Sequence, residues 1–304
     1  MSTPENVSFK SQGLKIAAHL YRPVPGSPDR KGAAVVIAHP WTSIKEQSPA
    51  NYARVLSQAG FYCLCPDAGY QGESEGEPRG LEDPYQRVED IKNAVTFLVG
   101  HADVSSDRIG ALGICAAGGY VPFAAQTDTR IRAVGTSAAV CVGTMARRGF
   151  DQDSSSLEAL RSQLGAAAAS RNSDVGAGAP VPLVDMLPPS LEAAPRDLPE
   201  SFRDLTSYYK TDRGRNLAAN QTHPRGWDLM ANFDALRHND MISPRPLLMI
   251  TGTKAATRWY SEDGVANAKE PKELYVIEDK THADLYDRID EAGKKLVEFY
   301  GQYL

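Results

Sequence analysis

One stretch decides the fold: Ile109-Gly110-Ala111-Leu112-Gly113-Ile114-Cys115-Ala116-Ala117-Gly118-Gly119-Tyr120. A short apolar run leads into a glycine, one nucleophilic side chain, two alanines and two more glycines, and a helix-like segment follows. This order is typical of a nucleophile elbow, with cysteine where serine is usual. The turn strains the backbone of the nucleophile and needs small neighbours, because strand and helix approach closely. A buried, inert cysteine in a glycine-rich turn is the alternative interpretation.

The elbow predicts how an oxyanion would be held beside the candidate nucleophile, Cys115. The N–H of Ala116 would be free to bond it. A second donor is expected in the loop His39-Pro40-Trp41, which follows the first buried strand. The N–H of Trp41 fits that role, and the His39 imidazole would brace the loop.

A cysteine nucleophile needs a base to form thiolate or a cation to stabilise it. Of the six histidines, His282 is the best candidate, because it follows the last predicted strand. In the chain order nucleophile, acid, histidine, the histidine loop lies there. A surface histidine is the alternative.

The acid of such a triad is the weak point of the prediction. It should follow the strand that ends at Thr251, but Ala256 stands at the expected position. Glu262 and Asp263 come a turn or more later. They are candidate acids, or they are the charges that favour the N-terminus of the next helix. A Cys–His pair without any acid is a third option, since thiolate forms more readily than alkoxide.

Composition bounds the class of protein. The chain has 304 residues, 42% hydrophobic and 23% charged, enough for one large α/β domain or a domain with an insertion. A net charge of −5 argues against a nucleic-acid binder. The polar start predicts no secretory signal, and no run approaches the about 18 apolar residues of a membrane span. Four cysteines without metal-type spacing predict a reducing, cytoplasmic setting and no metal or cofactor.

Apolar runs and helical segments alternate along the chain, which predicts a mostly parallel, doubly wound α/β sheet. The expected strands cover 7–21 (two strands joined at Gln12-Gly13), 33–38, 61–65, 108–112, 131–136, 246–251 and 273–277; the expected helices cover 52–58, 83–98 and 288–303.

The region from 144 to 235 has no evident buried strand and is rich in alanine and proline. We interpret it as a helical lid inserted into a core formed by 1–143 and 236–304. A disordered linker is the alternative for part of it, although its apolar and aromatic content favours packing. His39, Tyr70 and Tyr120 are candidates for substrate contact, and the tyrosines are alternatively packing residues.

The order of these motifs resembles that of α/β-hydrolases over nearly the whole chain: His39-Pro40-Trp41, Pro66-Asp67-Ala68-Gly69-Tyr70-Gln71-Gly72-Glu73-Ser74, the elbow, and Thr281-His282-Ala283-Asp284-Leu285-Tyr286-Asp287. The cysteine elbow resembles that of dienelactone hydrolases. A closer resemblance is to the dienelactone-hydrolase-like enzymes of fungal polyketide clusters, of the fumagillin polyketide transferase type. By position it implies Cys115 as nucleophile and His282 as base. Ala117 departs from the usual glycine or serine, and Ala256 from the acid of many relatives.

The resemblance implies hydrolysis or transfer of a polyketide-type acyl group in secondary metabolism. An ester or thioester is the expected substrate, free or on a polyketide synthase carrier domain. No nucleic acid or membrane partner is expected, and a homodimer stays open. Because Ala256 stands at the acid position and Ala117 departs from the usual elbow, a second hypothesis stays open: the protein is a cyclase or an enzyme that makes or breaks C–C bonds. A non-catalytic binding protein is a third.

Overall fold

The computed structural model describes residues 3–173, 181–216 and 218–304. These residues form an eight-stranded sheet with the order β1-β2-β4-β3-β5-β6-β9-β10. The strands are β1 (Glu5–Ser11), β2 (Leu14–Tyr21), β3 (Ala34–Ala38), β4 (Tyr62–Pro66), β5 (Ile109–Ile114), β6 (Ile131–Ser137), β9 (Leu247–Gly252) and β10 (Lys272–Ile277). β1 and β2 pair antiparallel, as do β2 and β4, and the other pairs are parallel.

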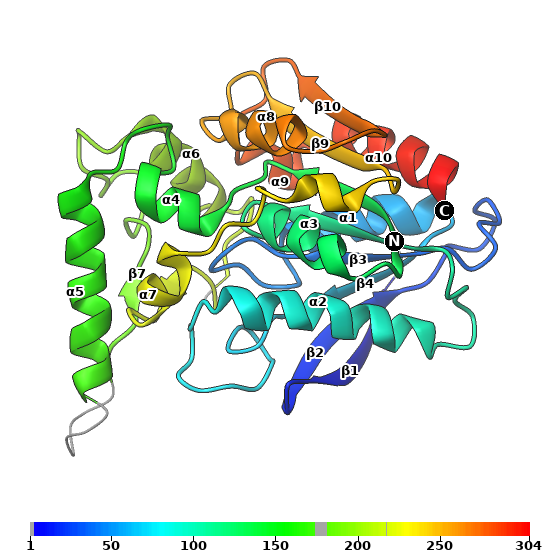
Figure 1. The fold of residues 1–304 in the computed structure, drawn as a ribbon, viewed down its shortest axis with the longest axis horizontal. Coiled ribbons are helices and arrows are strands. Elements are labelled where there is room, and N and C mark those ends of the chain that lie inside the picture. The colour runs from blue at the N-terminus through cyan, green and yellow to red at the C-terminus, as the bar shows by residue number, and fades with distance from the viewer. Residues whose placement is uncertain (1–2, 174–180, 217) are drawn as a thin grey trace.

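The central strands are apolar on both faces because helices cover both. α2 (Pro84–Val99) packs against α3 (Ala117–Thr127), and α1 (Ser48–Gln58) packs against α10 (Asp290–Tyr303). Figure 1 shows the first pair in front of the sheet and the second behind it. The last third of the chain also contains three short helices: η1 (Asn239–Ile242), α8 (Arg258–Ala266) and α9 (Asp284–Asp287). The mostly parallel α/β sheet expected from the sequence is confirmed.

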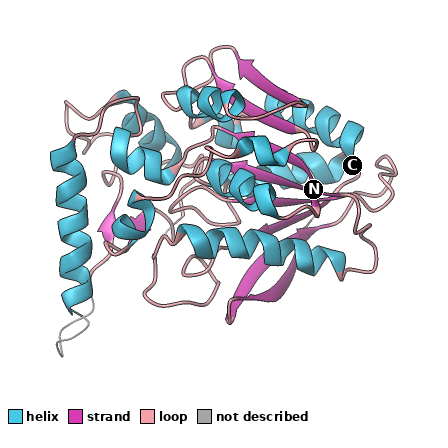
Figure 2. Cartoon of the chain, in the orientation of Figure 1, coloured by secondary structure: helices cyan, strands magenta, loops and turns pink. Residues whose placement is uncertain are grey.

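Between β6 and β9 the chain leaves the sheet. This segment contains α4 (Val142–Arg148), α5 (Leu157–Ser173), α6 (Glu200–Tyr209), α7 (Gly226–Ala231) and a small ladder of β7 (Val184–Asp185) with β8 (Gln221–Thr222). It lies beside the sheet and is mostly helix and loop (Figures 1 and 2). We call it the lid below; its exact boundaries at 144 and 235 stay a prediction.

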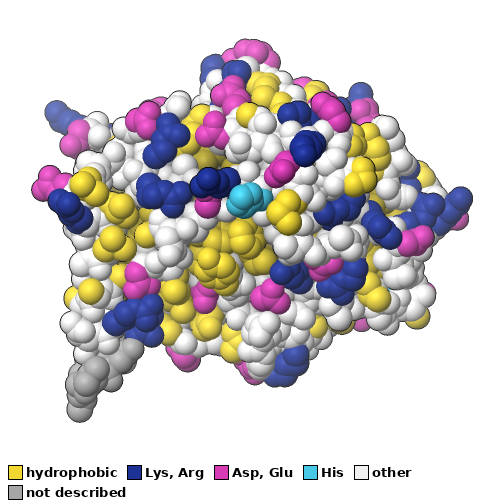
Figure 3. Space-filling model, viewed as in Figure 1, with side chains coloured by type: hydrophobic (Ala, Val, Ile, Leu, Met, Phe, Trp, Pro, Cys, Tyr) yellow, Lys and Arg dark blue, Asp and Glu magenta, His cyan; other side chains and the backbone are white. Residues whose placement is uncertain are grey.

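The surface carries mixed charge. Figure 3 shows acidic and basic side chains interspersed over the face in view. Among the described residues, helices long and apolar enough to cross a bilayer are absent.

Candidate active site

Cys115 lies on a sharp turn between β5 and α3. Its φ is +55°, in the left-handed region that strains a side-chain-bearing residue. Its N–H donates to Ser137 O at 3.0 Å, and its carbonyl accepts from Gly118 N at 2.8 Å. A Cβ on Gly113 would lie 2.0 Å from Ala117 O, so only glycine fits where the strand meets the helix. The elbow geometry predicted from the sequence is therefore present.

The thiol of Cys115 is nearly enclosed, with the residue 8% exposed. Burial raises its pKa to about 11, which is the dominant effect, while hydrogen bonding with the Tyr286 hydroxyl and with the Ala116 N–H acts in the opposite direction. At neutral pH the sulfur is therefore a thiol in the resting protein. A separate group must take its proton when it attacks.

His282 follows β10 and is buried, packed edge-on against Phe150 with ring centroids 5.0 Å apart. Burial lowers the pKa of its imidazole to about 3, so the ring is neutral. Its Nδ1 lies 2.6 Å from Thr257 Oγ1, and its Nε2 lies 2.9 Å from the Tyr286 hydroxyl. A neutral imidazole held on both nitrogens can accept a proton at Nε2.

Tyr286 links the two predicted catalytic side chains. Its hydroxyl contacts Nε2 of His282 and also hydrogen-bonds the Cys115 thiol. Tyr286 lines the cavity above the thiol together with Cys115, and His282 lies behind it. The Tyr286 hydroxyl thus connects the thiol and the imidazole by hydrogen bonds, an arrangement that the sequence did not indicate.

The candidate acids are not brought to the imidazole. Glu262 is exposed on α8 and pairs with Arg258, with Nε and Oε1 2.8 Å apart. Asp263 is exposed on the same helix. The buried side of α8 carries other residues, so both carboxylates face solvent. The alternative, charges at the N-terminus of the next helix, is wrong as well, because α8 begins at Arg258 and has no acidic residue in its first turn. Glu262 and Asp263 are surface charges farther along that helix, and Thr257 occupies the place of the acid.

Both predicted oxyanion donors line the cavity. Ala116 directs its N–H at the Cys115 sulfur. Trp41 N–H has no backbone acceptor within the described part of the chain. The Trp41 indole is fixed from the lid, since its Nε1 donates to Thr222 Oγ1 at 3.3 Å and its ring meets Trp227 edge-on. Both residues predicted to supply an oxyanion hole therefore lie at the cavity that Cys115 lines.

His39 lies beneath the cavity instead of in it. Its Nδ1 lies 2.7 Å from Pro40 O, and its Nε2 accepts from Ala68 N at 3.0 Å. Arg87 holds the same loop through His39 O at 2.7 Å. His39 thus braces the loop that carries Trp41, as one of the two roles considered for it predicted, and substrate contact is not supported.

The two tyrosines predicted to touch substrate are also outside the cavity lining. Tyr120 is fully buried and donates to Glu82 Oε1 at 2.8 Å. Tyr70 has a φ of +69° and packs over Gly76 in the loop after β4. Both are packing residues, because neither of them lines the cavity above Cys115.

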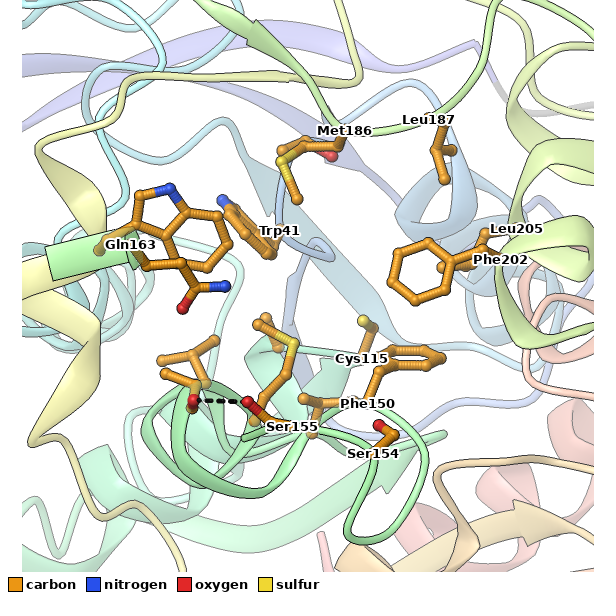
Figure 4. A pocket seen from close by; sticks show the side chains of 18 of the residues that line it. Trp41, Cys115, Phe150, Ser154, Ser155, Gln163, Met186, Leu187, Phe202 and Leu205 are labelled. Carbon is orange, nitrogen blue, oxygen red and sulfur yellow. Dashed lines mark hydrogen bonds between the residues drawn. The ribbon is translucent and has the colours of Figure 1, made fainter. Parts of the chain in front are cut away.

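The cavity above Cys115 has a volume of about 290 Å³. Most of its wall is apolar, and much of it belongs to the lid (Figure 4). The large apolar side chains include Trp41, Met145, Phe150, Met186, Phe202 and Trp227. Such a wall suits an apolar ligand.

The lid also holds the loop that carries His282. Asp204 of α6 accepts from Thr281 Oγ1 and from Ala283 N, both at 2.8 Å. Arg213, just after α6, forms a two-point ion pair with Asp287, with Nη2 to Oδ1 at 2.7 Å and Nε to Oδ2 at 2.9 Å. The residues on either side of the imidazole are therefore fixed by the lid.

Among the described side chains, one acidic cluster has the spacing to hold a metal ion: Glu46, Asp67 and Glu73. The ammonium group of Lys45 already lies among them, 2.7–2.8 Å from each carboxylate. The lysine cation thus occupies the position that a metal ion would take, which makes these carboxylates part of a structural ion-pair network.

Two functional residues were missed by the sequence reasoning. Tyr286 stands four residues after His282, the helical spacing that places two side chains together. Thr257 stands one residue after Ala256, and a hydroxyl was not considered as a partner for the imidazole. The lid residues of the cavity carry no motif, and only the fold brings them over Cys115.

A family model described as "Alpha/beta hydrolase family" matches residues 24–297. With the sheet order and the elbow, this match shows that the chain belongs to the alpha/beta hydrolase family.

Several known proteins are similar to it. The uncharacterized protein YcjY of Escherichia coli is 34% identical over 306 residues, which cover 98% of each chain. The crystal structure of the hypothetical protein PA2218 from Pseudomonas aeruginosa superposes with a TM-score of 0.91 at 33% identity, covering 100% of this chain and 94% of that one.

A fungal protein has the same fold at lower identity. The alpha/beta hydrolase GrgF of a Penicillium species, also described as a polyketide transferase, superposes with a TM-score of 0.82 at 20% identity, covering 99% of each chain. Its sequence aligns at 25% identity over 272 residues, which cover 84% of this chain and 82% of GrgF. At the level of the family, these relatives support hydrolase or acyl-transfer chemistry.

Proposed function

We propose that this protein transfers an acyl group from an ester or thioester through a covalent intermediate on Cys115. His282 is the base, and it acts through Tyr286. One observation carries the proposal: a single hydroxyl contacts both the thiol and the imidazole, at the floor of an apolar cavity.

In the first step the sulfur attacks the acyl carbonyl and a carbon–sulfur bond forms. The thiol proton passes to the Tyr286 oxygen while the phenol proton passes to His282 Nε2, so the phenol ends as it began. Burial lowers the pKa of the imidazole to about 3, so Nε2 is unprotonated at neutral pH and has a free lone pair for this proton. The negative charge on the carbonyl oxygen is held by the N–H groups of Trp41 and Ala116.

The tetrahedral adduct then collapses and the bond to the leaving group breaks. The departing thiol or alcohol takes the proton back from the imidazolium, again through Tyr286. A water molecule or an acceptor alcohol next attacks the acyl carbon and gives its proton to His282 through Tyr286. The carbon–sulfur bond then breaks, the acid or the new ester leaves, and the Cys115 sulfur takes the proton back along the same path. Burial makes the imidazolium unstable, which favours return of the proton to the leaving group.

A polyketide-type acyl thioester is the substrate class that we propose, free or on a carrier domain. The apolar cavity wall fits a long carbon chain. GrgF, which has the same fold over nearly its whole length, is described as a polyketide transferase.

The test is the mass of the intact protein after incubation with acyl thioesters of N-acetylcysteamine. We expect an adduct equal to the acyl group, which is absent from Cys115→Ala and present in the control Cys63→Ala, whose thiol is buried in β4. Full turnover by folded Cys115→Ala would refute the proposal. An isomeric product formed without adduct would instead favour the cyclase hypothesis.

A further inference from the structure

Gln163 of the lid helix α5 has a polar atom that the structure leaves without a partner. Its Oε1 is buried, and no hydrogen bond reaches it from any residue that the structure describes. Gln163 lines the same cavity as Cys115. Figure 4 shows its amide among the cavity side chains, on the opposite side of the view from Cys115.

The two serines of the cavity wall provide a contrast. The Ser154 hydroxyl donates to Asp151 O at 2.6 Å, and the Ser155 hydroxyl donates to Ala146 O at 3.3 Å. Both hydroxyls are satisfied by the lid itself. Buried polar groups in native proteins are nearly always hydrogen-bonded, so an exception in a binding cavity needs an explanation.

Packing does not explain the glutamine. α5 is mostly exposed, and its buried residues are Ala167 and Ser170. Ala159, one turn before Gln163, also lines the cavity, so this face of α5 is turned to the cavity. A methionine or leucine would fill the same space without leaving a bare acceptor in an apolar wall.

We propose that Gln163 is a specificity-determining residue that accepts a hydrogen bond from a hydroxyl on the acyl chain of the substrate. The substrate class is then a hydroxylated acyl thioester, with its hydroxyl away from the scissile carbonyl. The inference rests on the proposed function, because it assumes that the acyl group attached to Cys115 extends toward α5. An acceptor atom selects a donor, so a hydroxyl is bound and a plain alkyl chain leaves Oε1 unpaired.

The test uses octanoyl thioesters that carry a hydroxyl at successive carbons, with the unsubstituted octanoyl thioester as reference. The native protein is expected to prefer at least one hydroxylated isomer by about tenfold in kcat/KM. Gln163→Met, which keeps the length and removes the acceptor, is expected to abolish this preference. The control Ser162→Ala, on the exposed side of α5, keeps it.

A binding measurement separates this inference from the reaction itself. Folded Cys115→Ala is titrated calorimetrically with octanoic acid and its hydroxylated isomers, with and without Gln163→Met. Preferential binding that Gln163→Met removes supports the inference even if no acyl-enzyme ever forms. The inference would be overturned if Cys115→Ala with the native Gln163 bound all isomers with equal affinity. It would also be overturned if Gln163→Met lowered the affinity for every isomer by the same factor.

Discussion

Oγ1 of Thr257 lies 2.6 Å from Nδ1 of His282, so a neutral hydroxyl holds the imidazole where most triads have a carboxylate. A hydroxyl can fix the ring orientation and the tautomer. It cannot stabilise an imidazolium as a negative charge does, and the pKa of His282 is accordingly lowered to about 3 by burial without a counteracting charge. The protonated form of this ring must therefore be short-lived.

Thr257→Val removes the hydroxyl at nearly constant volume, and Thr257→Ser keeps it. We expect the valine variant to lose about tenfold in kcat, because the loss of one hydrogen bond frees the ring to rotate. The serine variant should retain most of the activity. Equal activity of the two variants in steady-state assays would show that the contact does not orient the base.

Tyr286→Phe removes the hydroxyl that joins thiol and imidazole. We expect acylation to slow by about a hundredfold or more, since proton transfer loses its carrier. Tyr208→Phe is the matched control: Tyr208 packs edge-on against Tyr286 with ring centroids 5.0 Å apart, and its hydroxyl has no hydrogen-bond partner among the described residues. Single-turnover acylation, followed by mass, measures both variants. A similar decrease in both would assign the effect to cavity shape.

Glu262→Gln and Asp263→Asn test the acids that the sequence suggested. Both carboxylates face solvent, so the double variant should keep kcat/KM within about twofold of the native value. Its thermal stability should change by less than about 1 kcal/mol, as expected for an exposed ion pair. A loss of activity comparable to that of Thr257→Val would mean that one of them reaches the imidazole during turnover.

Alkylation of Cys115 by iodoacetamide should increase with pH well beyond the range of an ordinary thiol. The raised pKa of about 11 keeps the sulfur protonated below that pH, so the thiolate fraction rises about tenfold per unit from pH 7 to 9. Free cysteine, titrated in parallel, levels off once the pH passes about 8.5. A plateau near pH 7 for the protein would instead reveal a stable thiolate–imidazolium pair.

Gly113→Ala should be severely destabilising, by about 3 kcal/mol or more, because the added Cβ would lie 2.0 Å from Ala117 O. Gly165→Ala provides the matched control. It lies within α5, where an added Cβ meets nothing within 4 Å, and a gain of about 0.5–1 kcal/mol is expected from helix propensity. Urea denaturation of the two variants compares them directly. Similar stability would contradict the tight elbow.

The fold could be predicted from the sequence because its signals are local. The apolar run at 33–38 corresponds to β3 (Ala34–Ala38), buried along its whole length, and glycines mark the turn at Cys115. Side-chain periodicity and small residues at close approaches suffice for such features. α5 lacked a comparable signal, since its solvent-exposed surface leaves no apolar stripe.

The site was only half predictable. Cys115 and His282 stand at positions set by the strands before them. Tyr286 and Thr257 act through contacts that depend on how two loops meet, and the sequence gives no measure of that distance. Gln163 lies farther still from any motif, because only the fold of the lid brings α5 to the cavity.

The hydrogen bonds that Asp204 accepts from Thr281 and Ala283 have a consequence for the order of events in the reaction. Any opening that lifts α6 would draw the chain on both sides of His282 with it. Substrate entry and the chemical step would then alternate. The open protein would admit substrate but would not hold the His282 imidazole in place, and the closed protein would react but would not admit substrate. A reactive acyl-enzyme would thus be shielded from bulk water by the same motion that activates it.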